Sequence, residues 1–146
     1  MAFHADVHAE QKFRIGTRVK DKSGNEWIYL KGVSSLVAGD AVTYDEAGAT
    51  ALLAANAKGP VAFAGAAVNA TTEFGWFGIA GSFTANGVAN SADNALIGRE
   101  TTDGKVGDGR AAGDEILNCI ARSATTAAAN MTVQCYYPFV NDATGS

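Results

Sequence analysis

The sequence predicts an all-β fold: a small single-domain β-barrel or sandwich with an extended N-terminal arm. Short apolar runs of strand length alternate with turn signals about every 8–12 residues over most of the chain. No segment of about 10–12 residues has the period of an amphipathic helix. A length of 146 residues fits one domain, and 47% hydrophobic with 18% charged residues is a globular composition.

The N-terminal part predicts an arm followed by a hairpin. Residues 1–12 are polar and lack a regular period, so we expect an arm that is either frayed or pinned against a neighbour. Residues 13–20 alternate between apolar and mostly basic side chains, which predicts a half-buried strand with a basic outer face. A turn over 21–25 then leads into an aromatic and β-branched return strand over 26–33.

The middle of the chain predicts several short strands. The pair Gly39-Asp40 is a turn signal before the strand 41–44, and residues 45–48 form a second turn. Residues 51–59 fit either a short strand or a helical turn that ends at Gly59-Pro60. Further strands are expected over 61–70, 71–81 and 82–90.

The C-terminal part predicts two strands around a glycine-rich loop within 94–123, and a last strand over 131–140. A polar tail, 142–146, follows. We therefore divide the chain into the arm 1–12, one β domain over 13–141 and this tail.

The strand 71–81 is apolar on both faces. Phe74 and Trp76 fall on one side, and Phe77 and Ile79 on the other. Only three of the fifty residues from 49 to 98 are charged. A chain of this size is mostly surface, so it has difficulty covering both faces of every strand. One alternative is a core strand covered within one chain. The other, which we favour, is that these four residues form a subunit interface.

The residues that could carry catalysis or bind a metal are few. His4 and His8 have the spacing of two metal ligands on a helix, but no third ligand is evident. The loop 103–115 has four acids and four glycines, yet their spacing does not match a helix-flanked calcium loop. We expect no catalytic residue, no metal and no cofactor.

Charge and segment composition limit the partners. The net charge is −4 and the pI is about 5, which disfavours a nucleic-acid partner despite the basic strand. No apolar run of about 18 residues predicts a membrane span, and the first residues do not resemble a secretion signal. Cys119 and Cys135 are expected to be free thiols in a reducing cytoplasm, although a disulfide is possible if their strands pair.

Two resemblances bear on function. The hairpin "GTRVKDKSGNEWIYLKG", the segment "SLVAGDAVTYDEAGAT", the low-charge stretch with "GWFGIAG" and the strand "MTVQCYYPFVN" together resemble head decoration (cement) proteins of tailed bacteriophages. The similarity covers about residues 13–141. It implies a β-rich, trimeric protein on the outside of a capsid. Separately, "AAGDEILNCIA" resembles the strand entry of trimeric dUTP pyrophosphatases, but Glu115 stands where that family has arginine.

The favoured hypothesis is a non-enzymatic protein that stabilises a phage capsid from outside, made in the host cytoplasm and located on the virion. Its expected partners are the major capsid protein and further copies of itself, with neither nucleic acid nor membrane. The candidate capsid contacts are Phe3, His4, His8, Phe13, Arg14, Arg18 and Lys20. Alternatives are a glycan-binding or adhesion module, for which "YYPFVND" would supply aromatic and polar side chains, and a small trimeric nucleotide hydrolase.

Overall fold

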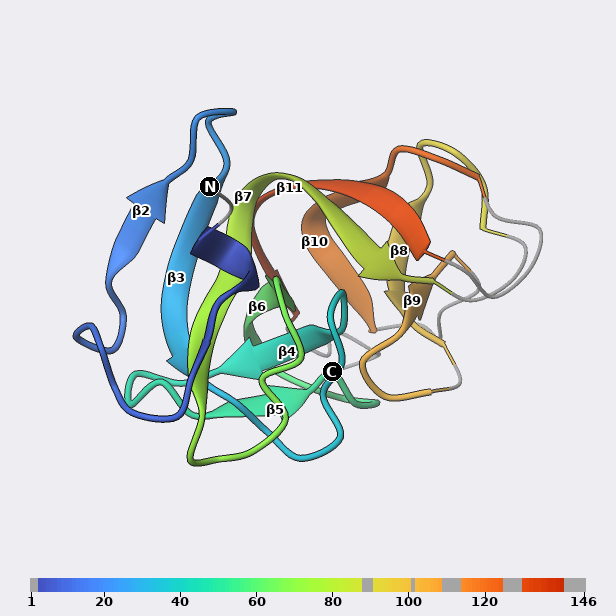
Figure 1. Ribbon diagram of the computed structural model, residues 1–146. Helices are drawn as coiled ribbons and strands as arrows, with labels where there is room; N and C mark the ends of the chain where they lie inside the picture. The colour runs from blue at the N-terminus through green and yellow to red at the C-terminus, as the bar shows by residue number, and fades with distance from the viewer. Residues whose placement is uncertain (1–2, 88–90, 101, 109–113, 125–129, 141–146) are drawn as a thin grey trace.

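The computed structural model describes residues 3–87, 91–100, 102–108, 114–124 and 130–140. Its regular structure is one short 3₁₀ turn and an 11-stranded sheet with antiparallel strand pairs. The predicted all-β, sandwich-like fold is therefore confirmed (Figure 1). No helix in these ranges is long and apolar enough to cross a membrane. The polar tail lies outside the described residues.

The strands follow one another along the chain with short links. Their bounds are β1 Val7–His8, β2 Arg18–Lys20, β3 Glu26–Lys31, β4 Ala41–Tyr44, β5 Thr50–Leu52, β6 Gly59–Ala64, β7 Phe74–Asn86, β8 Leu96–Arg99, β9 Val106–Gly107, β10 Glu115–Ala121 and β11 Asn130–Val140, and the 3₁₀ turn η1 spans Phe3–Ala5.

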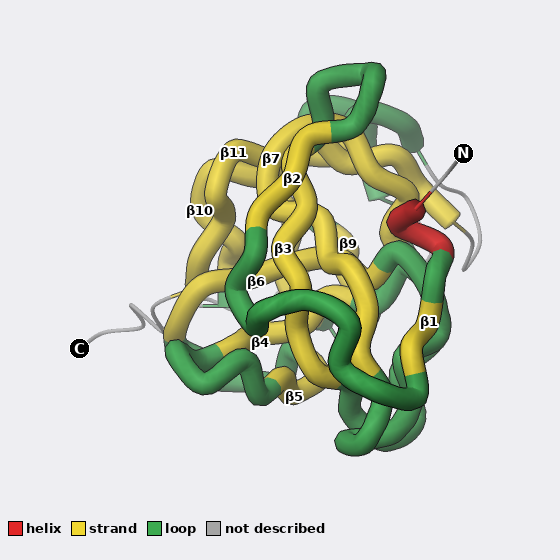
Figure 2. The backbone as a smooth tube through the Cα atoms, turned by 60° about the vertical axis from the view of Figure 1, so that its left-hand side comes forward, coloured by secondary structure: helices red, strands yellow, loops and turns green. Residues whose placement is uncertain are grey.

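The longest strand, β7, organises the sheet. Its first part pairs with β3, and its second part pairs with β11. The change of partner falls at Ala80 and Gly81, where Gly81 adopts a φ of 122° that other residues rarely reach. Strand β6 pairs with both β7 and β11, so the sheet curls around a central core (Figures 1 and 2). The full order is β2-β3-β7-β6-β11-β10-β8-β9, and the two end strands do not close into a barrel.

Both faces of the central strands are buried within the single chain. One face of β3 and β7 contributes Trp27, Tyr29 and Trp76 to the larger core cluster. The opposite face contributes residues such as Phe77 and Ile79 to a second, separate cluster. Full burial of one such side chain stabilises the fold by about 1.5–3 kcal/mol.

The predicted subunit interface is therefore wrong for three of its four residues. Trp76, Phe77 and Ile79 are buried, and Phe74 is half-buried against the larger cluster. Of the two alternatives that the sequence left open, a strand covered within one chain is the correct one.

Strand β4 and two loops supply the cover for the second face. Val42 of β4, Leu36 from the loop before it and Val68 from the loop before β7 all belong to the second cluster. On the other face, a Cβ at Gly78 would collide with the ring of Phe83, so glycine allows this close packing. Because the cover comes from segments far apart in sequence, strand periodicity could not reveal it.

Several expected elements differ in extent. The strand predicted over 13–20 is regular only at 18–20, because Arg14–Thr17 form a turn closed by the Thr17 N–H donating to the Arg14 carbonyl. The two strands predicted over 71–81 and 82–90 are one continuous strand, β7. Residues 50–52 are a strand, which settles the ambiguity over 51–59. The described residues of the segment 94–123 form three strands rather than two.

Substitution of Phe77 tests the role of the second face. We expect Phe77→Ala to lower the free energy of unfolding by about 3–5 kcal/mol and the milder Ile79→Val by about 0.5–1.5 kcal/mol, because both leave cavities. Urea unfolding of the isolated chain measures this. Val37→Ala, at a side chain that is 48% exposed, should change it by less than about 0.5 kcal/mol. Near wild-type stability of Phe77→Ala would contradict a core role.

Candidate functional site

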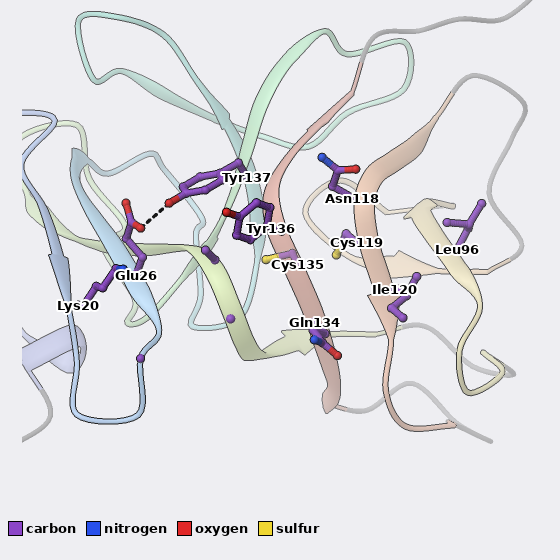
Figure 3. A pocket seen from close by; sticks show the side chains of 13 residues that line it. Lys20, Glu26, Leu96, Asn118, Cys119, Ile120, Gln134, Cys135, Tyr136 and Tyr137 are labelled. Atoms are coloured by element: carbon purple, nitrogen blue, oxygen red, sulfur yellow. Dashed lines mark hydrogen bonds between the residues drawn. The ribbon is translucent and has the colours of Figure 1, made fainter.

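A groove lies over β7 at the point where its pairing changes from β3 to β11. Ala80 of β7 is the register partner of both Glu26 on β3 and Tyr136 on β11. The groove extends from the β2–β3 hairpin across this part of β7 to strands β8, β10 and β11, and it has a volume of about 740 Å³. We call it the tyrosine groove, and its side walls carry Lys20, Glu26, Leu96, Asn118, Gln134, Tyr136 and Tyr137 (Figure 3).

An irregularity in the pairing of β10 with β11 turns two consecutive tyrosines outward. Leu117 pairs with Phe139, and Cys119 pairs with Cys135. An advance of two residues along β10 therefore corresponds to an advance of four residues along β11. Regular alternation would bury either Tyr136 or Tyr137, but both are exposed. Pro138, which lacks a backbone N–H, follows the tyrosines directly.

The backbone at this irregularity is strained. Tyr137 has a φ of 53° and Asn118, on the facing strand, has a φ of 62°. Asparagine tolerates this left-handed conformation, but a bulky aromatic residue rarely adopts it. Such backbone strain costs about 1–3 kcal/mol and concentrates at functional sites. The distorted strand pair is thus a candidate site on structural grounds alone.

The Tyr137 ring is fixed by a buried carboxylate. Its hydroxyl donates a hydrogen bond to Oε1 of Glu26 at 2.5 Å, and Glu26 is only 8% exposed (Figure 3). The guanidinium of Arg18 lies over the same ring, 5.9 Å from its centroid. The hydrogen bond to Glu26 raises the pKa of Tyr137, because it stabilises the neutral phenol.

Tyr136 stands at the rim with 68% of its surface exposed. Its ring meets the Tyr137 ring edge to face, with centroids 4.7 Å apart. Within the described part of the chain, the exposed side-chain amides of Asn118 and Gln134 have no hydrogen-bonding partner. The groove therefore combines an aromatic surface with uncommitted polar groups.

Two thiols lie on the floor of the groove. Cys119 and Cys135 are register partners on β10 and β11, and both are free and buried. A hydrogen bond with Cys135 and burial both raise the pKa of the Cys119 thiol. A thiol held in its protonated form is a poor nucleophile.

A second groove lies beside the N-terminal arm, and we call it the arm groove. It has a volume of about 550 Å³ and is lined by Asp6, His8, Lys12, Phe13, Val19 and Trp76. Phe13 is 47% exposed, although its ring also touches Tyr29 and Trp76.

The arm is held against its own domain. Strand β1 pairs with the start of β7, His4 stacks on the ring of Trp27 with centroids 4.5 Å apart, and His8 bonds to the Tyr29 hydroxyl at 2.8 Å. Of the predicted capsid contacts, Phe13, Arg14, Arg18 and Lys20 are exposed, whereas His4 and His8 are half-buried. Phe3 lies in η1, and its side chain is outside the described residues.

The predicted contact residues do not form one surface. His8 and Phe13 line the arm groove, whereas Lys20 lines the tyrosine groove. The two histidines do not join a metal cluster, because no group of three metal-ligating side chains occurs in the described ranges. In the acidic loop, Asp103 pairs with Arg99, while Asp114 accepts a hydrogen bond from the Asn56 N–H.

Sequence reasoning named part of the tyrosine groove only within an alternative, in which "YYPFVND" supplies the aromatic side chains of a glycan-binding module; it did not identify the groove itself. The signal was the Tyr136-Tyr137-Pro138 run, which breaks the alternation of the preceding residues 131–135. Glu26 gave no signal, because its pairing with Tyr137 joins residues 111 positions apart.

Comparisons with known proteins found no match to this chain: no protein family model, no curated protein and no solved structure reached significance. Function must therefore be argued from the site itself.

Glu26→Gln tests the anchor of the groove. We expect the pKa of Tyr137 to fall back toward the ordinary value of about 10 in this variant, as read by ultraviolet titration of the tyrosines. In the wild type, the folded chain holds the Tyr137 proton more tightly than the unfolded chain does. This difference contributes its full share to the free energy of unfolding below about pH 10, the pKa of tyrosine in the unfolded chain. The contribution is lost as the pH rises through the higher pKa of the folded chain.

The unfolding free energy of the wild type should therefore fall more steeply above pH 10 than that of Glu26→Gln. Glu46→Gln, at an exposed glutamate, is the matched control and should titrate like the wild type. Identical titration curves for all three proteins would show that the hydrogen bond does not form.

The thiols should be slow to react in the folded chain. We expect Cys119 and Cys135 to react with a thiol reagent far more slowly than an added reference thiol at the exposed position 34, made by Ser34→Cys. In denaturant all three thiols should react at similar rates. Equal rates in the native protein would contradict the buried placement.

Proposed function

We propose that this chain is a non-enzymatic structural protein that binds the outside of a tailed-bacteriophage capsid and stabilises it. In this proposal it is made in the host cytoplasm, and its partners are the major capsid protein and further copies of itself. The resemblance to decoration proteins suggested this function, and the arm groove offers a surface that fits it.

The exposed apolar groups beside the arm carry the proposal. Phe13 and Val7 are 47% and 40% exposed, although large apolar side chains are usually covered. Phe13 rests on the rings of Tyr29 and Trp76, so it is presented in a fixed position. A fixed aromatic side chain is a typical anchor of a protein–protein interface, because little side-chain entropy is lost on binding.

The segment that carries Phe13 is basic, although its Arg18 and Lys20 lie at the tyrosine groove. Residues 10–22 hold five Lys and Arg side chains against two carboxylates, which gives a local charge of +3 in a chain of −4. The rest of the chain therefore carries −7. Lys12 in the arm groove and Arg14 next to Phe13 would orient this part of the protein toward an acidic surface and speed the encounter.

The edge of β2 offers a further mode of contact. Within the described pairings β2 bonds only to β3, so its other edge presents unpaired backbone groups at the margin of the sheet (Figure 1). A segment of the capsid protein could add as a strand there, beside the groove that Val19 lines.

The homotrimer remains part of the proposal, but its contacts have to come from residues other than those first predicted. Trp76, Phe77 and Ile79 are buried in the chain's own cores, so a trimer would use exposed side chains instead. Light scattering of the purified chain measures its oligomeric state.

Cosedimentation with empty phage heads that lack the protein tests the proposal. We expect Arg14→Glu to weaken attachment about tenfold, or ~1.4 kcal/mol, because it reverses a charge next to the docking surface. Phe13→Ala should weaken it at least as much. Lys58→Glu makes the same charge change at an exposed residue that lines neither groove, and it should bind like the wild type.

Circular dichroism spectra would show that each variant is folded. Wild-type binding by both Arg14→Glu and Phe13→Ala would remove the arm groove from the proposal. Failure of the wild-type protein itself to sediment with heads would overturn the function.

A further inference from the structure

We propose that the tyrosine groove is a carbohydrate-binding site, which takes a short stretch of a hydroxyl-rich polysaccharide with one pyranose ring on the face of Tyr136. This activity goes beyond capsid attachment and does not rest on it. The tyrosine groove and the arm groove share no lining residue.

The first argument is the exposure of Tyr136. A side chain of this size that is 68% exposed offers a flat apolar surface to a ligand. The C–H face of a pyranose ring is also flat and apolar, so the two surfaces can stack with exclusion of water. The adjacent ring of Tyr137 limits how far Tyr136 can rotate, because their centroids lie 4.7 Å apart.

The second argument is preorganisation. Tyr137 is held by its 2.5 Å hydrogen bond to a buried carboxylate, and its backbone keeps a left-handed φ that is costly for tyrosine. This strain serves no visible purpose in core packing, since it turns two aromatic rings toward solvent. A binding site gains affinity from such fixed geometry, because less freedom is lost when the ligand arrives.

The third argument is the set of polar groups around the rings. Each amide side chain of Asn118 and Gln134 offers both hydrogen-bond donors and an acceptor, and neither has a partner within the described residues. The paired hydroxyls of a sugar need both kinds of partner at close spacing. The groove volume of about 740 Å³ lies within the usual range for small-ligand sites.

Charge argues against a nucleic-acid ligand, which could also stack on tyrosine. A strand of nucleic acid needs a positively charged track for its phosphates. The described residues that line the tyrosine groove include one cationic side chain, Lys20, and one carboxylate, Glu26, so they offer no such track. The whole chain has a net charge of −4. A ligand without phosphates therefore fits the groove better.

The experiment uses the full chain on a glycan array that includes bacterial surface polysaccharides and mucin-type glycans. We expect the wild type to bind a defined group of glycans. Tyr136→Ala should lose at least about tenfold in affinity for them by calorimetric titration, whereas Tyr136→Phe, which keeps the ring, should retain most of the affinity. Val37→Ala is the control for an exposed apolar side chain elsewhere and should bind normally.

Three results would overturn the inference. They are absence of glycan binding by the wild type, unchanged binding by Tyr136→Ala, and an effect of Tyr136→Ala on self-association or on oligonucleotide binding instead. Head cosedimentation of Tyr136→Ala separates this inference from the proposed function. A variant that loses glycans but still binds heads would support the site and leave capsid attachment intact.

Discussion

The packing of β7 between two apolar layers is the constraint on which the rest of the structure depends. One layer meets it through Trp76 and Phe83, and the other through Phe77 and Ile79. Because both layers come from the same chain, the strand can be long, uncharged and still covered. Gly78 allows the ring of Phe83 to pack directly on the strand, and Gly81 allows the strand to turn toward a new partner.

Both candidate surfaces follow from the course of this strand. Its beginning pairs with β1 and so holds the arm beside Phe13. Its turn at Gly81 separates β3 from β11 and leaves the space that the tyrosines occupy. The core thus sets the position of each groove, while side chains outside the core determine what each groove can bind.

The sequence was sufficient for the fold class and for most strands, because turn signals and alternating side chains are local features. It also showed that residues 74–79 are apolar on both faces. It could not show what covers them, since Leu36, Val42 and Val68 reach the second face through tertiary folding. The surface-to-volume argument then favoured a partner subunit, and it failed because two loops and β4 supply the cover. The sequence offered the two tyrosines as part of a glycan-binding alternative, but the groove around them could not be predicted because Glu26 and Tyr137 meet only in three dimensions.

Ala80 has a particular place in this arrangement, since it pairs with Glu26 on one side and with Tyr136 on the other. Its side chain lies at the base of the split between the two strands. A larger residue there would raise the base of the groove and leave the side chains of its walls unchanged. The depth of the groove can therefore be changed through this one position, while the architecture and the outward-facing aromatic pair stay the same.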